Sequence, residues 1–204
     1  MHVAERDATL DLVLAPPHAP VAQLSRTPVR RDDAYPRLAA RGTLALGGHR
    51  MSVGGIFWLD RESGAPELPA PGVGRERFTI VLDDGRALFV SLERRAGGGT
   101  EIVRGALIDR RGRVTSLGAR DIAVENPLAT TWRNSRGVLY PSLWEIFVRE
   151  ARLDLAVVPV VQAQEIDPGI RGARFYDGSV DVERASPGPR DTGAGFVEVI
   201  LPSP

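Results

Sequence analysis

The sequence contains no cysteine and no lysine, and these two absences exclude several kinds of chemistry. Without cysteine the chain forms no disulfide, no thiolate nucleophile and no cysteine-ligated zinc or iron–sulfur centre. Without lysine it forms no Schiff base and lacks the amine of a phosphate-binding loop. Only three histidines are present, so a histidine-rich metal site or a Ser/His/Asp triad has few candidates. We therefore expect neither a metal nor an organic cofactor.

Net charge is also absent, because 26 Asp and Glu balance 26 Arg. Nucleic-acid binders need surplus positive charge, so we expect no nucleic-acid partner. No apolar run approaches the roughly 20 residues of a membrane span, and residues 1–10 lack the order of a signal peptide. These features predict no membrane insertion and a cytoplasmic location. The length of 204 residues with 43% hydrophobic residues predicts a single domain over residues 1–204.

Short strands dominate the pattern, because 22 Gly and 16 Pro leave few windows in which a helix could run. Apolar residues alternate along residues 78–82 and 88–92, and Asp84-Gly85 between them predicts a tight hairpin. Gly47-Gly48 predicts a second hairpin, and residues 109–114 a third. Residues 15–33, 66–72, 97–99 and 186–192 resemble loops. We predict an all-β fold, an antiparallel β-barrel of roughly ten strands over residues 37–201, preceded by an N-terminal strand and Pro-rich loop at 1–36.

Several segments, taken in order, resemble one known family. They are Trp58-Leu59-Asp60-Arg61-Glu62, the LDDGR hairpin at 82–86, TTWRNSRGVLYPSLWEIFV at 130–148, LDLAVVPVVQAQEI at 153–166, FYDGSVDV at 175–182 and GAGFVEV at 193–199. Their order is similar to that in the second barrel of the carotenoid 1,2-hydratases and their attachment-protein relatives. LDLVLAP at 10–16 is similar to the strand that ends the first barrel of that family. The resemblance covers about residues 10–200.

The resemblance implies a lipocalin-like barrel that binds long apolar ligands. Members of the family add water to carotenoid ends or promote cyclisations such as Diels–Alder reactions in natural-product pathways. Family members usually carry two barrels, and this length has room for one, so we expect a homodimer at about even odds. Ser63 and Tyr176 stand where the family has Trp, and residues 30–35 lack the His and Trp attributed to the hydratases.

Asp60 and Glu62 share parity on one predicted strand with Trp58, so two carboxyls and an indole point the same way. If that face is buried, the pKa of a carboxyl rises and it becomes a proton donor. The alternative, favoured two to one, is an ion pair between one of these carboxyls and an Arg that anchors the strand end.

Aromatic residues gather in the second half of the chain, where flat rings suit a polyene. They are Trp132, Tyr140, Trp144, Phe175 and Tyr176. For each ring a core position is favoured over a ligand contact by three to two. Gln164 and Glu165 follow an apolar strand and place polar groups at the barrel mouth, although Glu165 more often caps a turn or pairs with Arg. His49 beside the glycine pair is expected in an exposed turn.

These features together predict a cofactor-free cyclase that binds an elongated polyene or polyketide, by [4+2] cycloaddition. Its predicted catalytic residues are Asp60, Glu62, Tyr140 and Tyr176, and its predicted substrate-binding residues are Trp58, Trp132, Arg133, Trp144, Phe175 and Gln164. Holding two reacting ends at near-attack distance lowers the activation free energy of such a reaction. Two alternatives stay open: a hydratase that acts on a carotenoid or isoprenoid double bond with Asp60 as acid, and a carrier of hydrophobic ligands without catalytic activity.

Overall fold

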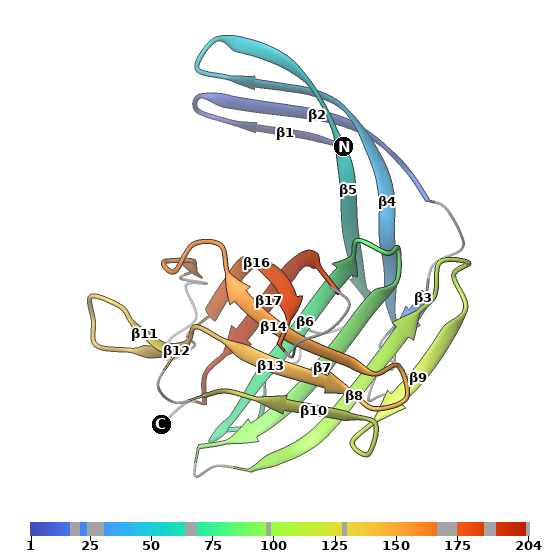
Figure 1. Ribbon diagram of the computed structural model, residues 1–204. Helices are drawn as coiled ribbons and strands as arrows, with labels where there is room; N and C mark the ends of the chain where they lie inside the picture. Colours follow the sequence, from blue (N-terminus) through green and yellow to red (C-terminus); the bar gives the residue numbers. More distant parts are fainter. Residues whose placement is uncertain are drawn as a thin grey trace. The chain divides into compact units, whose positions relative to one another are not determined.

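A computed structural model describes residues 1–16, 21–23, 31–63, 69–96, 99–127, 130–166, 175–185 and 191–202. The chain divides into two compact units, Met1–Ala65 and Pro66–Pro204. None of the described residues forms a helix that is long and apolar enough to span a membrane. Figure 1 shows strands throughout the described chain, as the sequence predicted.

The first unit is a five-stranded antiparallel sheet with the order β1-β2-β4-β3, in which β5 pairs with β4. Its strands are β1 (His2–Glu5), β2 (Ala8–Ala15), β3 (Val21–Gln23), β4 (Arg31–Leu46) and β5 (His49–Ser63). Gly47 and Gly48 have φ angles of 55° and 81°, which only glycine adopts easily, and they form the predicted turn between β4 and β5. The prediction of a loop over residues 15–33 is wrong in part, because β3 and the start of β4 lie within it.

One face of this first sheet is apolar. Leu10, Leu44 and Met51 lie opposite one another on β2, β4 and β5, since Leu10 pairs with Leu44 and Leu44 with Met51. Along each strand the next residue points to the other face, where polar Asp11, Thr43 and Ser52 form the neighbouring row. The alternation of side chains alone therefore makes this sheet amphipathic.

The second unit is a ten-stranded antiparallel sheet with the order β10-β13-β14-β16-β17-β6-β7-β8-β9, in which β15 pairs with β16. Its strands are β6 (Val73–Leu82), β7 (Ala87–Arg95), β8 (Thr100–Ile108), β9 (Val114–Gly118), β10 (Ile122–Glu125), β13 (Trp144–Val148), β14 (Leu153–Pro159), β15 (Glu165–Ile166), β16 (Phe175–Arg184) and β17 (Gly193–Ile200). A separate hairpin joins β11 (Thr131–Arg133) to β12 (Leu139–Pro141). Figure 1 shows the sheet, coloured green to red, curling into a nearly closed barrel.

The two free ends of the curled sheet meet through side chains. A Cβ on Gly105 of β8 would lie 2.7 Å from Cδ1 of Ile122 on β10, so glycine is what lets these strands approach. Arg94 of β7 donates hydrogen bonds to the Val124 carbonyl (2.9 Å) and to Oδ1 of Asn126 (2.8 Å), just after β10. The barrel is therefore closed on this side by packing and by one arginine instead of a strand ladder.

The predicted hairpins of the second unit are confirmed. Gly85 has a φ angle of 90° in the turn between β6 and β7, and Gly112 has a φ angle of 81° between β8 and β9. Residues of β6 alternate between buried and half-buried along its whole length. This period of two is what the apolar alternation in the sequence predicted.

Inward-facing side chains fill the interior of the barrel. Twelve side chains of this core are 0% exposed, so solvent does not reach them: Phe78, Ile80, Leu88, Val90, Trp144, Ile146, Val148, Leu153, Leu155, Val157, Val180 and Val197. Close packing of this kind supplies most of the free energy of folding.

The domain boundary predicted at residue 36 falls inside β4, and residues 37–63 lie in the first unit rather than with the barrel. The chain divides near residue 65 because β4 pairs with β2 and β5 pairs with β4, which holds both strands in the first sheet. That residues 1–204 form a single domain stays a prediction.

Candidate functional site

The predicted acid motif lies on β5 of the first unit. Trp58 and Asp60 share a face there, as predicted, and the Trp58 indole N–H donates a hydrogen bond to Oδ1 of Asp60 at 2.8 Å. Asp60 is exposed, so the burial on which its role as proton donor depended is not observed. The Glu62 side chain lies outside the described residues. Catalysis by these carboxyls stays a prediction.

The aromatic residues of the second half separate into three environments. Trp144 is fully buried and packs edge to face against Phe78, with ring centroids 5.6 Å apart, which confirms its core position. Tyr140 lies between Trp132 (6.0 Å) and Tyr176 (5.4 Å), so these three rings form one cluster. Phe175 is half-buried on the opposite parity to Tyr176. The structure thus brings together three of the five predicted rings.

Arg133, also predicted to bind substrate, is exposed on the β11–β12 hairpin. Its guanidinium donates a hydrogen bond to the Gly137 carbonyl within the same hairpin, at 3.1 Å. This contact stabilises the turn, and a role in binding substrate stays a prediction.

A carboxyl that the sequence analysis did not select is buried in the barrel. Glu76 of β6 is 6% exposed and faces inward with Phe78, Ile80 and Leu82. Its Oε1 accepts a hydrogen bond from the Asn126 amide at 3.3 Å and lies 3.4 Å from Nε of Arg94. The sequence does contain a signal for this position: Glu76 is a charged residue that alternates in step with the apolar residues of the same strand.

Burial raises the pKa of Glu76, because an ionised carboxylate loses its hydration there. The Arg94 charge opposes that rise first, followed by the Asn126 amide and the Trp144 indole. Desolvation is the larger effect, so the neutral acid is populated at higher pH than for an exposed glutamate. A carboxylic acid whose neutral form is favoured by burial is suited to proton donation.

Two buried polar atoms make no hydrogen bond of ordinary geometry within the described chain, although the indole lies near enough to lower the pKa of Glu76. They are Oε2 of Glu76 itself and Nε1 of Trp144. A buried polar atom without a partner costs about 1–3 kcal/mol, so folded proteins rarely keep one without a reason.

The register of the sheet places further polar groups at the same end of the barrel. Glu76 pairs with Val199, Val199 with Tyr176, and Tyr176 with Glu165, across β6, β17, β16 and β15. Adjacent strands lie about 4.8 Å apart, so the Glu76 and Tyr176 backbones are about 10 Å apart. The buried acid and the ring cluster therefore line one end of the barrel interior.

Glu165 is held by two short hydrogen bonds. The Tyr140 hydroxyl donates to Oε1 at 2.6 Å, and the Asn134 amide donates to Oε2 at 2.6 Å. Asn134 is 7% exposed, and its Oδ1 accepts the backbone N–H groups of Arg136 and Val138, which fixes it in the β11–β12 turn. Glu165 is half-buried, so this cluster reaches the solvent at the barrel end.

Gln164, predicted to bind substrate, uses its side-chain amide to bond the backbone of Ser179, as a neighbouring strand would do. Its Oε1 accepts the Ser179 backbone N–H at 2.9 Å, and its Nε2 donates to the carbonyls of Ser179 (3.3 Å) and Val161 (2.7 Å). A Cβ on Gly178 would lie 2.3 Å from Nε2, so this arrangement requires glycine. Nε2 also donates to the Tyr176 hydroxyl at 3.3 Å. Contact of Gln164 with substrate stays a prediction.

Tyr176, predicted to be catalytic, is 1% exposed, and its hydroxyl donates to the Val161 carbonyl at 3.2 Å. Burial raises the pKa of this phenol, and the hydrogen bond from Gln164 opposes that rise. The phenol is therefore neutral at physiological pH, and a catalytic role stays a prediction.

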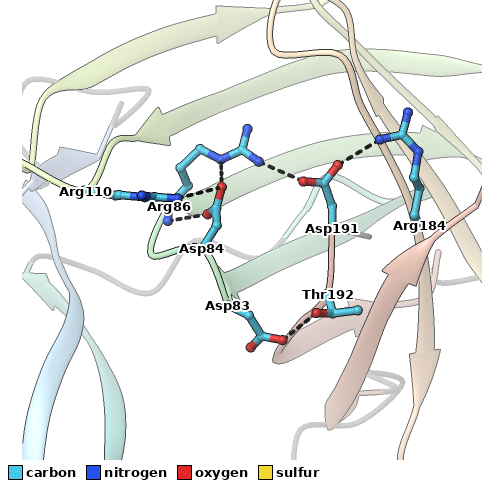
Figure 2. Close-up of polar contacts among 7 residues, drawn as sticks. All are labelled: Asp83, Asp84, Arg86, Arg110, Arg184, Asp191 and Thr192. Atoms are coloured by element: carbon cyan, nitrogen blue, oxygen red, sulfur yellow. Dashed lines mark hydrogen bonds and ion pairs between the residues drawn. The ribbon is translucent and has the colours of Figure 1, made fainter. Parts of the chain in front are cut away.

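The opposite end of the barrel carries a network in which carboxylates meet arginines (Figure 2). Arg86 bridges Asp84 (2.6 Å) and Asp191 (2.9 Å), and Arg184 donates to the other oxygen of Asp191 at 3.1 Å. Asp83 accepts a hydrogen bond from Thr192. This network connects the β6–β7 turn to the end of β16 and the start of β17.

Metal ligands do not gather in the described ranges, since no group of three or more His, Cys, Asp or Glu side chains there could hold an ion. The candidate site offers carboxyl, phenol, amide and indole groups instead. These groups can donate and accept protons and hydrogen bonds.

The fold and the packed interior define a lipocalin-like β-barrel protein. A family profile described as AttH-like matches residues 1–200. The chain therefore belongs to the AttH-like family, which confirms the predicted resemblance to the attachment-protein relatives of the hydratases.

Two solved structures are similar in fold. An AttH protein from Nitrosomonas europaea has a TM-score of 0.81 and 23% identity over 100% of this chain and 64% of its own. Kievitone hydratase from Nectria haematococca has a TM-score of 0.66 and 14% identity over 85% of this chain and 53% of its own. This chain thus spans about half to two thirds of their lengths. No curated protein matches the sequence significantly.

Proposed function

We propose that this chain is a cofactor-free hydratase that adds water to a carbon–carbon double bond of a hydrophobic substrate, with Glu76 as the proton donor. The observation that carries the proposal is a buried inward-facing carboxyl whose Oε2 has no hydrogen-bond partner among the described residues. Burial favours its neutral form, which is the form that a general acid needs.

The surroundings of Glu76 suit a cation formed on a branched alkene. Protonation of a double bond by a carboxylic acid leaves a carbocation, which is least costly at a carbon with three carbon substituents. The buried Trp144 indole beside Glu76 contributes an electron-rich ring to this end of the interior, and aromatic rings attract cations. These features favour an isoprenoid-type double bond as the substrate.

The similarity in fold to kievitone hydratase supports hydration as the reaction class. The predicted cyclase and the predicted carrier stay predictions. A cycloaddition needs space for two reacting ends, whereas the inward side chains listed above at 0% exposure occupy the interior. Acid catalysis at the barrel end needs only the double bond to approach Glu76, so we place hydration first.

The proposal is tested with kievitone as the probe and mass spectrometry as the measurement. The wild type should form a product heavier by one water, and Glu76→Gln should form it about 10²-fold more slowly or worse. Glu150→Gln makes the same change at an exposed turn and should hydrate at the wild-type rate. If Glu76→Gln hydrates as fast as the control, Glu76 is not the acid.

The pH profile gives a second test. Because the acid must be protonated, the wild-type rate should fall as pH rises through the raised pKa of Glu76. Arg94, Asn126 and Trp144 are the charged and polar groups that face this carboxyl. The residual rate of Glu76→Gln should lack that limb of the profile.

A further inference from the structure

Hydration moves two protons, one to carbon and one away from the attacking water. When water attacks the carbocation, its oxygen forms the new C–O bond and must lose a proton. Glu76 has just delivered its proton to carbon, and in an acid–base pair the second group lies on the far side of the reacting atoms. A group that receives the proton of water without returning it to Glu76 would lie at the same end of the barrel, beyond the reacting atoms.

Tyr140 and Glu165 lie at that end of the barrel, further along the row of Glu76. Tyr176 stands in the register row of Glu76 with Val199 between them, and the Tyr140 ring lies 5.4 Å from the Tyr176 ring. Glu165 pairs with Tyr176 in the same row. Glu165 lies three strands from Glu76, about 14 Å between backbones, and inward-facing side chains of a curled sheet extend toward one another across that span.

The hydrogen bonds fix the direction of proton transfer. The Tyr140 hydroxyl donates to Oε1 of Glu165 at 2.6 Å, a length typical of a bond to an ionised carboxylate. The second oxygen of Glu165 accepts from Asn134, which the β11–β12 turn holds in place. A phenol oxygen accepts a proton as well as donating one, so Tyr140 can receive a proton from water and pass its own to Glu165.

We infer that Tyr140 and Glu165 form a proton relay that deprotonates the attacking water, with Asn134 as a positioning residue. The inference rests on the proposed hydratase function. The proton of Glu76 forms a C–H bond with the π electrons, the water oxygen forms the C–O bond, and the proton of water moves to Tyr140 while the Tyr140 proton moves to Glu165. Glu76 ends ionised and Glu165 protonated, and exchange with solvent restores both.

Reaction in D₂O separates the two halves of the mechanism. Glu76 in its deuterated form transfers deuterium to the alkene, and the cation either gains water or loses a proton to return an alkene labelled with deuterium. With kievitone as the probe, Tyr140→Phe and Glu165→Gln should lower alcohol formation about 10²-fold while the recovered alkene still gains deuterium. Glu76→Gln should lose both products.

The variants keep the packing that a structural role would need. Tyr140→Phe retains the ring between Trp132 and Tyr176 and removes only the hydroxyl. Tyr35→Phe makes the same change in the first unit and should leave both products unchanged. Asn134→Ala should lower alcohol formation less than Tyr140→Phe, again with deuterium incorporation retained.

The outcomes distinguish this inference from the function on which it rests. If alcohol and deuterium incorporation fall together in Tyr140→Phe and Glu165→Gln, the two residues are structural and the relay is wrong. If neither falls while Glu76→Gln is inactive, the relay is wrong and the hydratase stands. A wild type that neither hydrates the probe nor exchanges deuterium overturns the proposed function and the relay with it.

Discussion

The two ends of the barrel carry polar clusters of opposite character. At one end of β6, Glu76 is buried, and burial raises its pKa. At the other end, burial alone would raise the pKa of Asp84, but hydrogen bonds from the backbone and guanidinium of Arg86 lower it. Six residues of one strand, or about 20 Å, separate Glu76 from Leu82 beside that second cluster.

This difference shows how partners decide the role of a carboxyl. Asp84 and Asp191 contact three arginines: Arg86 contacts both carboxylates, Arg110 contacts Asp84 and Arg184 contacts Asp191 (Figure 2). Glu76 has one arginine at 3.4 Å and an oxygen without a hydrogen bond in the described chain. The end with the aspartate–arginine network, called here the paired end, is suited to holding turns together. The end with Glu76 is suited to proton transfer.

The largest effect on stability is expected at the paired end. Asp191→Ala removes the acceptor shared by Arg86 and Arg184, so unfolding in urea should show a loss of about 1–3 kcal/mol. The hydration rate at a temperature where the variant is folded should not change. Asp181→Ala, at an exposed position of β16, is the matched control. A lower rate with full stability would mean that the two ends are not functionally distinct.

A smaller effect, dependent on pH, is expected at Glu76. Its pKa is higher in the folded state than the ordinary 4.5, so the folded protein binds the proton more tightly than the unfolded chain. This group therefore disfavours folding increasingly as pH rises above about 4.5 and through the folded pKa. Urea unfolding at several pH values should show that Glu76→Gln loses less stability than the wild type over that rise. If the free energy of unfolding changes equally with pH in both proteins, Glu76 is ionised in the folded state without cost.

The smallest effect is expected at Asp109, in the exposed turn between β8 and β9. Hydrogen bonds from the backbone and side chain of Arg113, and from the Arg111 backbone, lower the pKa of Asp109 to about 2. Its stabilising contribution is present above the ordinary 3.8 and is lost as pH falls toward about 2. Asp109→Asn should lower the melting temperature slightly at pH 7 and less at pH 2. If the substitution lowers the melting temperature more at pH 2 than at pH 7, Asp109 does not stabilise the fold in its ionised form.

Much of the fold was predictable because strand alternation and glycine turns are local. The Asp84-Gly85, Gly47-Gly48 and residue 109–114 turns lie where the sequence placed them. The boundary of the units was not predictable, because it depends on β2 pairing with β4 across the residues that separate them in sequence. The pairing partners of a strand are not written in its own alternation.

The candidate site was predicted only in part for the same reason. Tyr140, Trp132 and Tyr176 were selected as rings, but their contact depends on the hairpin between β10 and β13. Glu76 was not predicted as a site residue, although it lies two residues from Phe78 and so faces inward with it. Its partner Asn126 lies 50 positions away in sequence and meets it only when the barrel closes.

The sequence by itself determined the all-β character, the tight turns and the limits on chemistry, because composition and side-chain alternation act over a few residues. The absence of cysteine and lysine removes thiol and amine chemistry and leaves carboxyl, phenol, amide, hydroxyl and three imidazole groups for any reaction. Only the tertiary structure decided which carboxyl is buried and which is paired. Burial and charge neighbours come from distant strands, and these two factors set whether a carboxyl keeps its proton.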